Sequence, residues 1–143
     1  MKIFSVLDIS ASGLSAERMR MNVIANNLAN AQSTESPDGG PYRREQVEFA
    51  SLLRRSLDNH IPGEELLGGV KVRGIVKSTE PFSKIYMPGH PKADKDGMVE
   101  MPNVSVVNEM VDMVTASRAY EANLAVMTTS KEMINKTLNA FSR

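Results

Sequence analysis

VVNEMVDMVTASRAYEANLAVMTTSKEMINKTLNAF, residues 106–141, is the stretch that decides the fold. Apolar residues recur along it at alternating spacings of four and three, a heptad pattern that predicts a helix packing along one seam. A helix over the last roughly 40 residues would be about 60 Å long, more than the width of a domain of this size. We therefore expect it to project or to pack against other chains. The seam is interrupted by polar side chains only at Ser117 and Lys131, and otherwise comprises Val106, Met110, Met113, Tyr120, Leu124, Met127, Ile134, Leu138 and Phe141.

A second helix is predicted near the start of the chain. From residue 6 to residue 31 there is no proline and a single glycine, and large apolar residues again recur every seven positions. The pattern dissolves into the turn-forming residues 32–41, which predict a loop. This seam comprises Leu7, Leu14, Met21, Ile24 and Leu28.

The sequence between the two helices has a different character. Short, partly alternating apolar runs at residues 45–49, 69–77 and 81–86, punctuated by glycine, predict a small β-rich module. Residues 52–57 fit either a short helix or the edge of an insertion. The expected fold class is α+β, with helical segments at 1–33 and 103–143 forming a coiled-coil-like layer and the β-rich module at 34–102.

Composition excludes several function classes. Seventeen Lys and Arg balance seventeen Asp and Glu, so no net charge draws the 143-residue chain toward nucleic acid. The chain has no cysteine, which excludes disulfides and thiol catalysis. No run of 18 apolar residues predicts a membrane span, and the N-terminus lacks the pattern of a cleaved signal peptide, so we expect no membrane insertion and export by another route.

No catalytic constellation is visible. His60 and His90 lie beside proline or glycine in predicted loops, without an adjacent pair of acids. Residues 92–97 resemble half of a calcium loop, but lysine and asparagine stand where the first carboxylate and the bidentate glutamate belong. We expect a protein that is not an enzyme and holds no cofactor or metal. The alternative is a self-contained α+β module that binds calcium or another ligand through Asp94, Asp96 and His90.

Residues 24–30, IANNLAN, place three asparagines in five positions of a predicted helix, although asparagine is a poor helix former. A buried amide without partners costs about 1 to 3 kcal/mol, so asparagines at a helix contact penalise wrong packing registers. We expect them to form hydrogen bonds across a helix–helix contact. With Asn22, which precedes this stretch, Asn26 and Asn30 stack at i, i+4 and i+8, and Asn27 lies on a neighbouring face.

Several stretches also carry a resemblance. Residues 12–16 (SGLSA) and 21–30 (MNVIANNLAN) resemble the N-terminal signature of the flagellar axial proteins of rod, hook and hook-associated type. Residues 37–44 (PDGGPYRR), 101–104 (MPNV), 109–113 (EMVDM) and 117–123 (SRAYEAN) are similar to the rod protein C family of proximal rod subunits. The segment 51–67 departs from it in being longer and more polar.

The resemblance implies a structural subunit of the bacterial flagellar basal-body rod that transmits torque from motor to hook. It implies an inner helical layer formed by both terminal helices, with the middle module outside it. The partners implied are copies of the chain, other rod subunits and the flagellar type III export apparatus. The implied location is the rod that spans the periplasm. We expect both seams and the asparagines at 22, 26, 27 and 30 to form the assembly interface.

Overall fold

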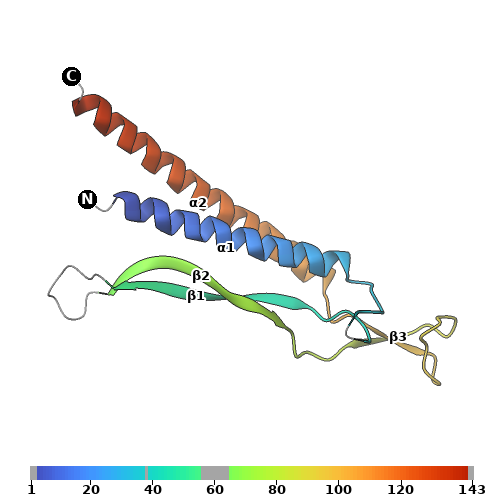
Figure 1. Ribbon diagram of the computed structural model, residues 1–143. Helices are drawn as coiled ribbons and strands as arrows, with labels where there is room; N and C mark the ends of the chain where they lie inside the picture. The colour runs from blue at the N-terminus through green and yellow to red at the C-terminus, as the bar shows by residue number, and fades with distance from the viewer. Residues whose placement is uncertain (1–2, 38, 56–64, 142–143) are drawn as a thin grey trace. The chain divides into compact units, whose positions relative to one another are not determined.

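The computed structural model describes residues 3–37, 39–55 and 65–141, in which a helix, four strands and a second helix follow one another (Figure 1). This order confirms the predicted α+β class. The elements are α1 (Ile3–Ala29), β1 (Glu45–Arg55), β2 (Glu65–Lys77), β3 (Ser83–Tyr86), β4 (Met98–Met101) and α2 (Val106–Phe141).

Local hydrogen bonds define the C-terminal end of α1 and the N-terminal end of α2. At the start of α2, the Ser105 hydroxyl accepts from the Asn108 N–H at 3.5 Å and the Ser105 carbonyl accepts from the Glu109 N–H at 2.9 Å, as expected of an N-cap. At the end of α1, the Asn30 amide donates to the Asn26 carbonyl at 2.9 Å. The chain then turns through residues 33–42, where Gly39 and Gly40 both have positive φ.

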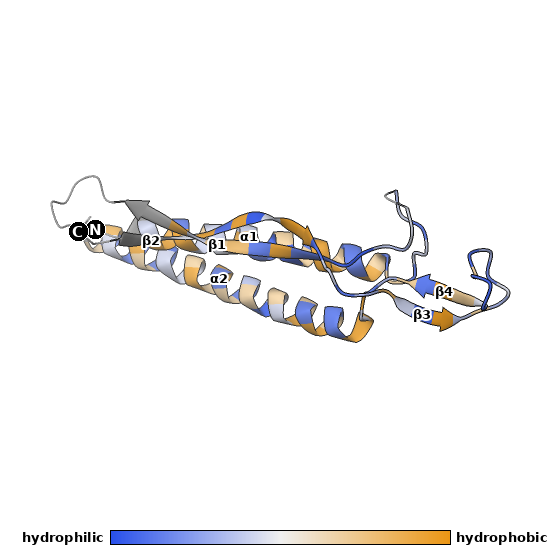
Figure 2. Ribbon diagram, turned by 90° about the horizontal axis from the view of Figure 1, so that it is seen from below, coloured by the Kyte–Doolittle hydropathy of each residue, from blue (hydrophilic) through white to orange (hydrophobic). Residues whose placement is uncertain are grey.

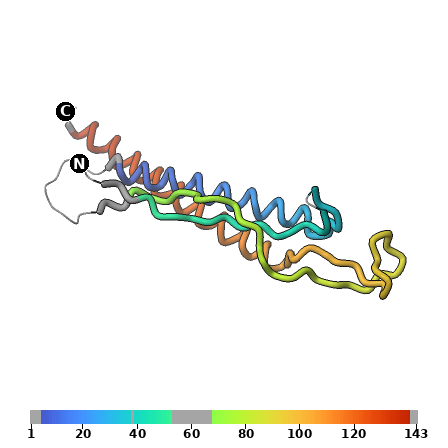
Figure 3. Tube along the Cα trace, turned by 60° about the horizontal axis from the view of Figure 1, so that its bottom comes forward, coloured from blue at the N-terminus to red at the C-terminus, as the bar shows by residue number. Residues whose placement is uncertain are grey.

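The strands form two separate two-stranded sheets, β1–β2 and β3–β4. The Ser78 N–H, just after β2, donates to the Arg44 carbonyl, just before β1, at 2.8 Å, so this pair is antiparallel. In the second pair Ser83 lies opposite Met101 and Tyr86 opposite Met98. Figure 3 traces this hairpin between the end of β2 and the start of α2.

The hairpin loop depends on one glycine. Gly97 has a φ of 74°, and its N–H donates to the Asp94 carbonyl at 3.0 Å. A Cβ at this position would lie 2.8 Å from Cε2 of Tyr86, so both its backbone conformation and its surroundings disfavour a side chain.

The strands run further than predicted. Residues 52–55, for which a helix and an insertion edge were both open, belong to β1, while 56 and 57 lie outside the described residues. Strand β4 was not predicted, because MVEM is too short and too interrupted to stand out from loop sequence. His60 and most of the divergent 51–67 segment also lie outside the described residues.

The chain divides into two compact units. The first unit combines residues 1–19, 48–74 and 116–143. Within it α1 approaches α2 closely at Gly13, where a Cβ would lie 2.9 Å from the Asn123 side-chain oxygen. The Ser12 hydroxyl donates to the Ile9 carbonyl at 2.6 Å and accepts from the Val70 N–H at 3.1 Å, so it joins α1 to β2.

The second unit combines residues 20–47 and 75–115. Asn27 of α1 contacts Glu109 of α2, and Arg20 contacts Asp112, so the two helices run antiparallel here. Across both units the buried apolar side chains among the described residues are few and mostly small: Ala16, Val23, Ile24, Val99 and Ala116. A core this small leaves much apolar surface uncovered.

Candidate functional site

The fully buried positions of α2 carry no large apolar side chain, while many large apolar side chains of this helix are exposed. Its buried residues are Glu109, Ala116 and Ser130, none of them a large apolar side chain. In contrast, soluble helices normally turn their apolar face inward. The large apolar residues left exposed on α2 are Val106, Val107, Met110, Val111, Val114, Leu124, Val126, Met133 and Leu138.

The most exposed group lies in the second unit, on the first turns of α2. Val107, Met110, Val111 and Val114 follow one another at i, i+3, i+4 and i+7, so they share one face of the helix. Their exposed fractions are 70%, 58%, 61% and 54%. We name these four residues the outer apolar patch; the apolar start of α2 is orange in Figure 2.

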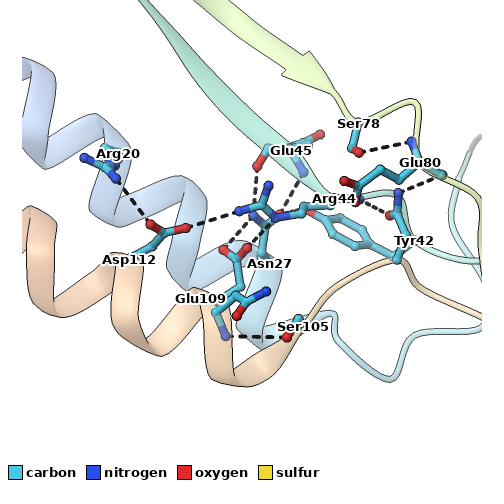
Figure 4. Close-up of polar contacts among 12 residues, drawn as sticks. Arg20, Asn27, Tyr42, Arg44, Glu45, Ser78, Glu80, Ser105, Glu109 and Asp112 are labelled. Carbon is cyan, nitrogen blue, oxygen red and sulfur yellow. Dashed lines mark hydrogen bonds and ion pairs between the residues drawn. The ribbon is translucent and has the colours of Figure 1, made fainter.

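The covered side of the same turns meets a buried polar cluster (Figure 4). At its centre Asn27, which is 1% exposed, pairs with the main chain of Glu45: its amide donates to the Glu45 carbonyl at 2.8 Å, and its oxygen accepts from the Glu45 N–H at 3.0 Å. The same amide donates to Oε2 of Glu109 at 3.0 Å, and the oxygen accepts from the Tyr42 hydroxyl at 2.9 Å. All the hydrogen-bonding capacity of the Asn27 side chain is therefore used.

Four charged side chains complete the cluster. Nε of Arg44 donates to Oε1 of Glu109, which is 0% exposed, in a short ion pair. Nη2 of Arg44 lies 3.3 Å from Asp112, and Arg20 lies 3.4 Å from the other oxygen of Asp112. Positive and negative groups thus alternate from Arg20 to Glu109. The buried carboxylate is stable here because a cation and an amide compensate it, whereas an unpaired buried charge costs several kcal/mol.

The pKa of Tyr42 reflects both burial and the carboxylates around it. Burial, together with the nearby carboxylates of Glu45 and Glu109, raises the pKa of its hydroxyl from 10.0 to about 12. The hydroxyl therefore stays protonated at neutral pH and can donate to Asn27.

The seam residues predicted in α1 are all at least partly covered. Ile24 is 5% exposed, and Leu7, Leu14, Met21 and Leu28 are half-buried. In the seam predicted in α2, Met113, Tyr120, Met127 and Ile134 are half-buried, whereas Val106, Met110, Leu124 and Leu138 are exposed. Phe141 ends the helix, and its side chain lies outside the described residues.

The four asparagines separate into different environments. Asn22 and Asn26 are exposed, and Asn30 is half-buried and bonds back to Asn26. Of the four, Asn27 is the one that bonds to α2, whereas Asn22, Asn26 and Asn30 form a stripe on the neighbouring face of α1. The structure therefore brings Asn27 together with α2 and leaves the stripe at the surface.

The sequence pattern did not predict which residues form the polar cluster around Asn27. Tyr42, Arg44, Glu109 and Asp112 come from segments more than 60 residues apart, so no local spacing joins them. A signal was nevertheless present, because all four lie within the stretches 37–44 and 109–113 that carried the family resemblance.

The structure does not support the alternative ligand site. Oδ1 of Asp94 accepts from the N–H groups of Asp96 and Met98, both at 2.9 Å, and Nδ1 of His90 accepts from the Lys92 N–H at 3.2 Å. These atoms stabilise the hairpin loop. Within the part of the chain that the structure describes, no three acidic or histidine side chains converge as a metal site, and no helix is long and apolar enough to cross a membrane.

Two family models match this chain, one toward each end. Residues 7–35 match the family model "Flagella basal body rod protein", and residues 95–140 match "Flagellar basal body rod FlgEFG protein C-terminal". The two matches cover most of α1 and all but the end of α2.

Relatives match the chain over nearly its whole length. The flagellar basal-body rod protein FlgC of Salmonella typhimurium is 46% identical, with 96% of this chain and 97% of the relative covered. The FlgC proteins of Borreliella burgdorferi and Aquifex aeolicus are 43% and 45% identical over 96% and 99% of this chain, and over 97% and 98% of their own lengths. The chain therefore belongs to the FlgC family of flagellar basal-body rod proteins, which are structural subunits that assemble with other rod components.

Proposed function

We propose that the chain transmits torque from the flagellar motor to the hook as a non-enzymatic building block of the rod, and that its neighbours dock on the outer apolar patch. The exposure of Val107, Met110, Val111 and Val114 carries this proposal. Isolated apolar residues at a surface are ordinary, but four that share one helix face form a surface suited to a protein contact.

Burial of this patch supplies a driving force for assembly. Fully burying one Val or Met side chain is worth roughly 1.5 to 3 kcal/mol, and more than half of the surface of each patch residue is exposed and available for burial. Several such contacts along α2 offset the entropy lost when subunits associate. The exposed seam positions Val106, Leu124 and Leu138 and the exposed Asn22 and Asn26 are proposed to extend the interface, whereas the buried Ile24 and Asn27 support it from within the chain.

The proposed partners are copies of this chain and other rod subunits in a helical assembly. Delivery through the flagellar type III export apparatus, to a rod that spans the periplasm, completes the proposal. A net charge of zero and the absence of cysteine are consistent with partners recognised by shape, with no role for nucleic acid, and with passage of an unfolded chain.

Met110→Asp tests the proposal directly. The side chain is 58% exposed, so the variant should keep the circular dichroism and thermal unfolding of the wild type. We expect it to lose sedimentable assemblies with purified rod subunits, because a charge would be buried in an apolar contact.

The matched control is Thr129→Asp, which adds the same charge at an exposed polar position of the same helix. It should assemble as the wild type does. Normal assembly and normal motility with Met110→Asp would contradict the proposal.

A further inference from the structure

We propose that Glu109 and Asn27 are positioning residues for assembly: they fix the rotation of α2 about its axis and so determine which face of the helix meets a partner. This inference rests on the proposed function above. It assigns the buried polar cluster a part in recognition as well as in folding.

The Glu109 carboxylate is held from two directions. Its two carboxylate oxygens bond to different segments, Oε1 to Arg44 beside β1 and Oε2 to Asn27 of α1. A side chain held at two points from two directions permits little rotation of the helix that carries it. The Ser105 cap fixes the same turn along the axis.

Rotation of α2 about its axis would place a different side chain in the polar cluster. A shift by one residue turns a helix by about 100°, which would bring Asn108 or Met110 to the position of Glu109. Asn108 could not neutralise Arg44, and Met110 could not bond to Asn27. Either change would leave buried charge or amide groups without partners, which is strongly penalised.

The outer apolar patch cannot by itself determine how α2 is oriented toward a partner. Hydrophobic burial is not directional, and the three valines of the patch present similar surfaces to a partner. Hydrogen bonds to Glu109 and Asn27 are directional. The polar side of α2 therefore supplies the specificity, while the apolar side supplies the affinity.

Hydrogen bonds also join the polar cluster to the rest of the second unit. The Asn27 side chain both donates to and accepts from the main chain of Glu45, so it is fixed to the start of β1. The Arg44 N–H donates to the Asn103 side chain at 2.8 Å, and Asn103 donates to the Glu80 carbonyl at 3.0 Å. The groups that hold α2 are thus tied to the rest of the second unit.

Glu109→Gln is the test, because it keeps the side-chain shape and removes the charge. Binding is measured by sedimentation about 20 °C below the melting temperature of the variant, where it is folded. We expect the variant to bind rod subunits about tenfold more weakly than the wild type, which corresponds to about 1.4 kcal/mol of binding free energy. The control is Glu100→Gln, which removes an exposed ion pair with Lys84. It should bind as the wild type does.

A double-mutant cycle separates positioning from simple stability. Met110→Ala should weaken assembly about tenfold in the wild type but only about threefold beside Glu109→Gln, because the patch no longer faces the partner consistently. Additive effects, or unchanged assembly of folded Glu109→Gln protein, would overturn the inference. If Glu109→Gln does not fold, the same cycle with Arg44→Lys, which keeps the charge but not the fork geometry, decides the question.

The two proposals can fail separately. Normal assembly of Met110→Asp removes the proposed docking role of the outer apolar patch, whereas membership of the rod family rests on the relatives. Loss of assembly in Met110→Asp together with normal assembly in Glu109→Gln removes only the positioning role.

Discussion

Truncation of Asn27 provides a quantitative test of the buried cluster. Asn27→Ala removes four hydrogen bonds of 2.8 to 3.0 Å from a side chain that is 1% exposed. At about 1 kcal/mol for each bond, partly offset by about 0.6 kcal/mol of improved helix propensity, the free energy of unfolding should fall by about 3 kcal/mol. In a chain of this length that corresponds to a melting temperature roughly 10 °C lower.

The control is Asn26→Ala, which removes an equal amide from the next, exposed position of the same helix. Its only cross-segment bond, to the Tyr42 hydroxyl, is 3.3 Å long, so the loss should stay below about 0.5 kcal/mol. Urea unfolding followed by circular dichroism measures both values. Equal losses in the two variants would refute the assignment of Asn27 as the residue that joins α1 to β1 and α2.

Three further outcomes are expected. The free energy of unfolding should fall as pH rises from 10 toward 12, because Tyr42 has a folded pKa of about 12 and keeps a proton that the unfolded chain loses; urea unfolding of Tyr42→Phe should show a smaller fall. Gly97→Ala should destabilise the hairpin by about 1 to 2 kcal/mol in amide exchange, since φ is 74° and Tyr86 is close, whereas Gly89→Ala, with open space around it, should not. Gly13→Val should lower the melting temperature more than Gly13→Ala, in which a gain of about 1 kcal/mol in helix propensity opposes the clash.

The regular elements were accessible from sequence because their signals are local. A sustained heptad pattern predicted a helix within residues 103–143, where α2 runs from Val106 to Phe141, and alternation at 69–77 identified most of β2. Strand β4 has four residues and no clear alternation, so its pairing with β3 depends on tertiary context that the sequence alone does not display.

The candidate site was less accessible. Periodicity identifies apolar positions, yet it cannot tell which apolar stripe of a helix faces its own chain and which faces a partner. On α2 the fully buried positions, Glu109, Ala116 and Ser130, fall beside the predicted seam and have no distinctive pattern in the sequence. Only the distant partners Arg44 and Asn27 explain why a glutamate is buried there.

The pairing of Asn27 with Glu45 has a consequence for mutational tolerance. Asn27 contacts the N–H and carbonyl of residue 45, which every amino acid except proline presents in the same way. Position 45 should therefore accept many residues in a saturation screen for motility, and proline should be the substitution that is lost most completely. Position 27 should accept almost none, because only a short carboxamide offers a donor and an acceptor at that reach. Two residues in direct contact would thus differ widely in the number of substitutions that each position tolerates.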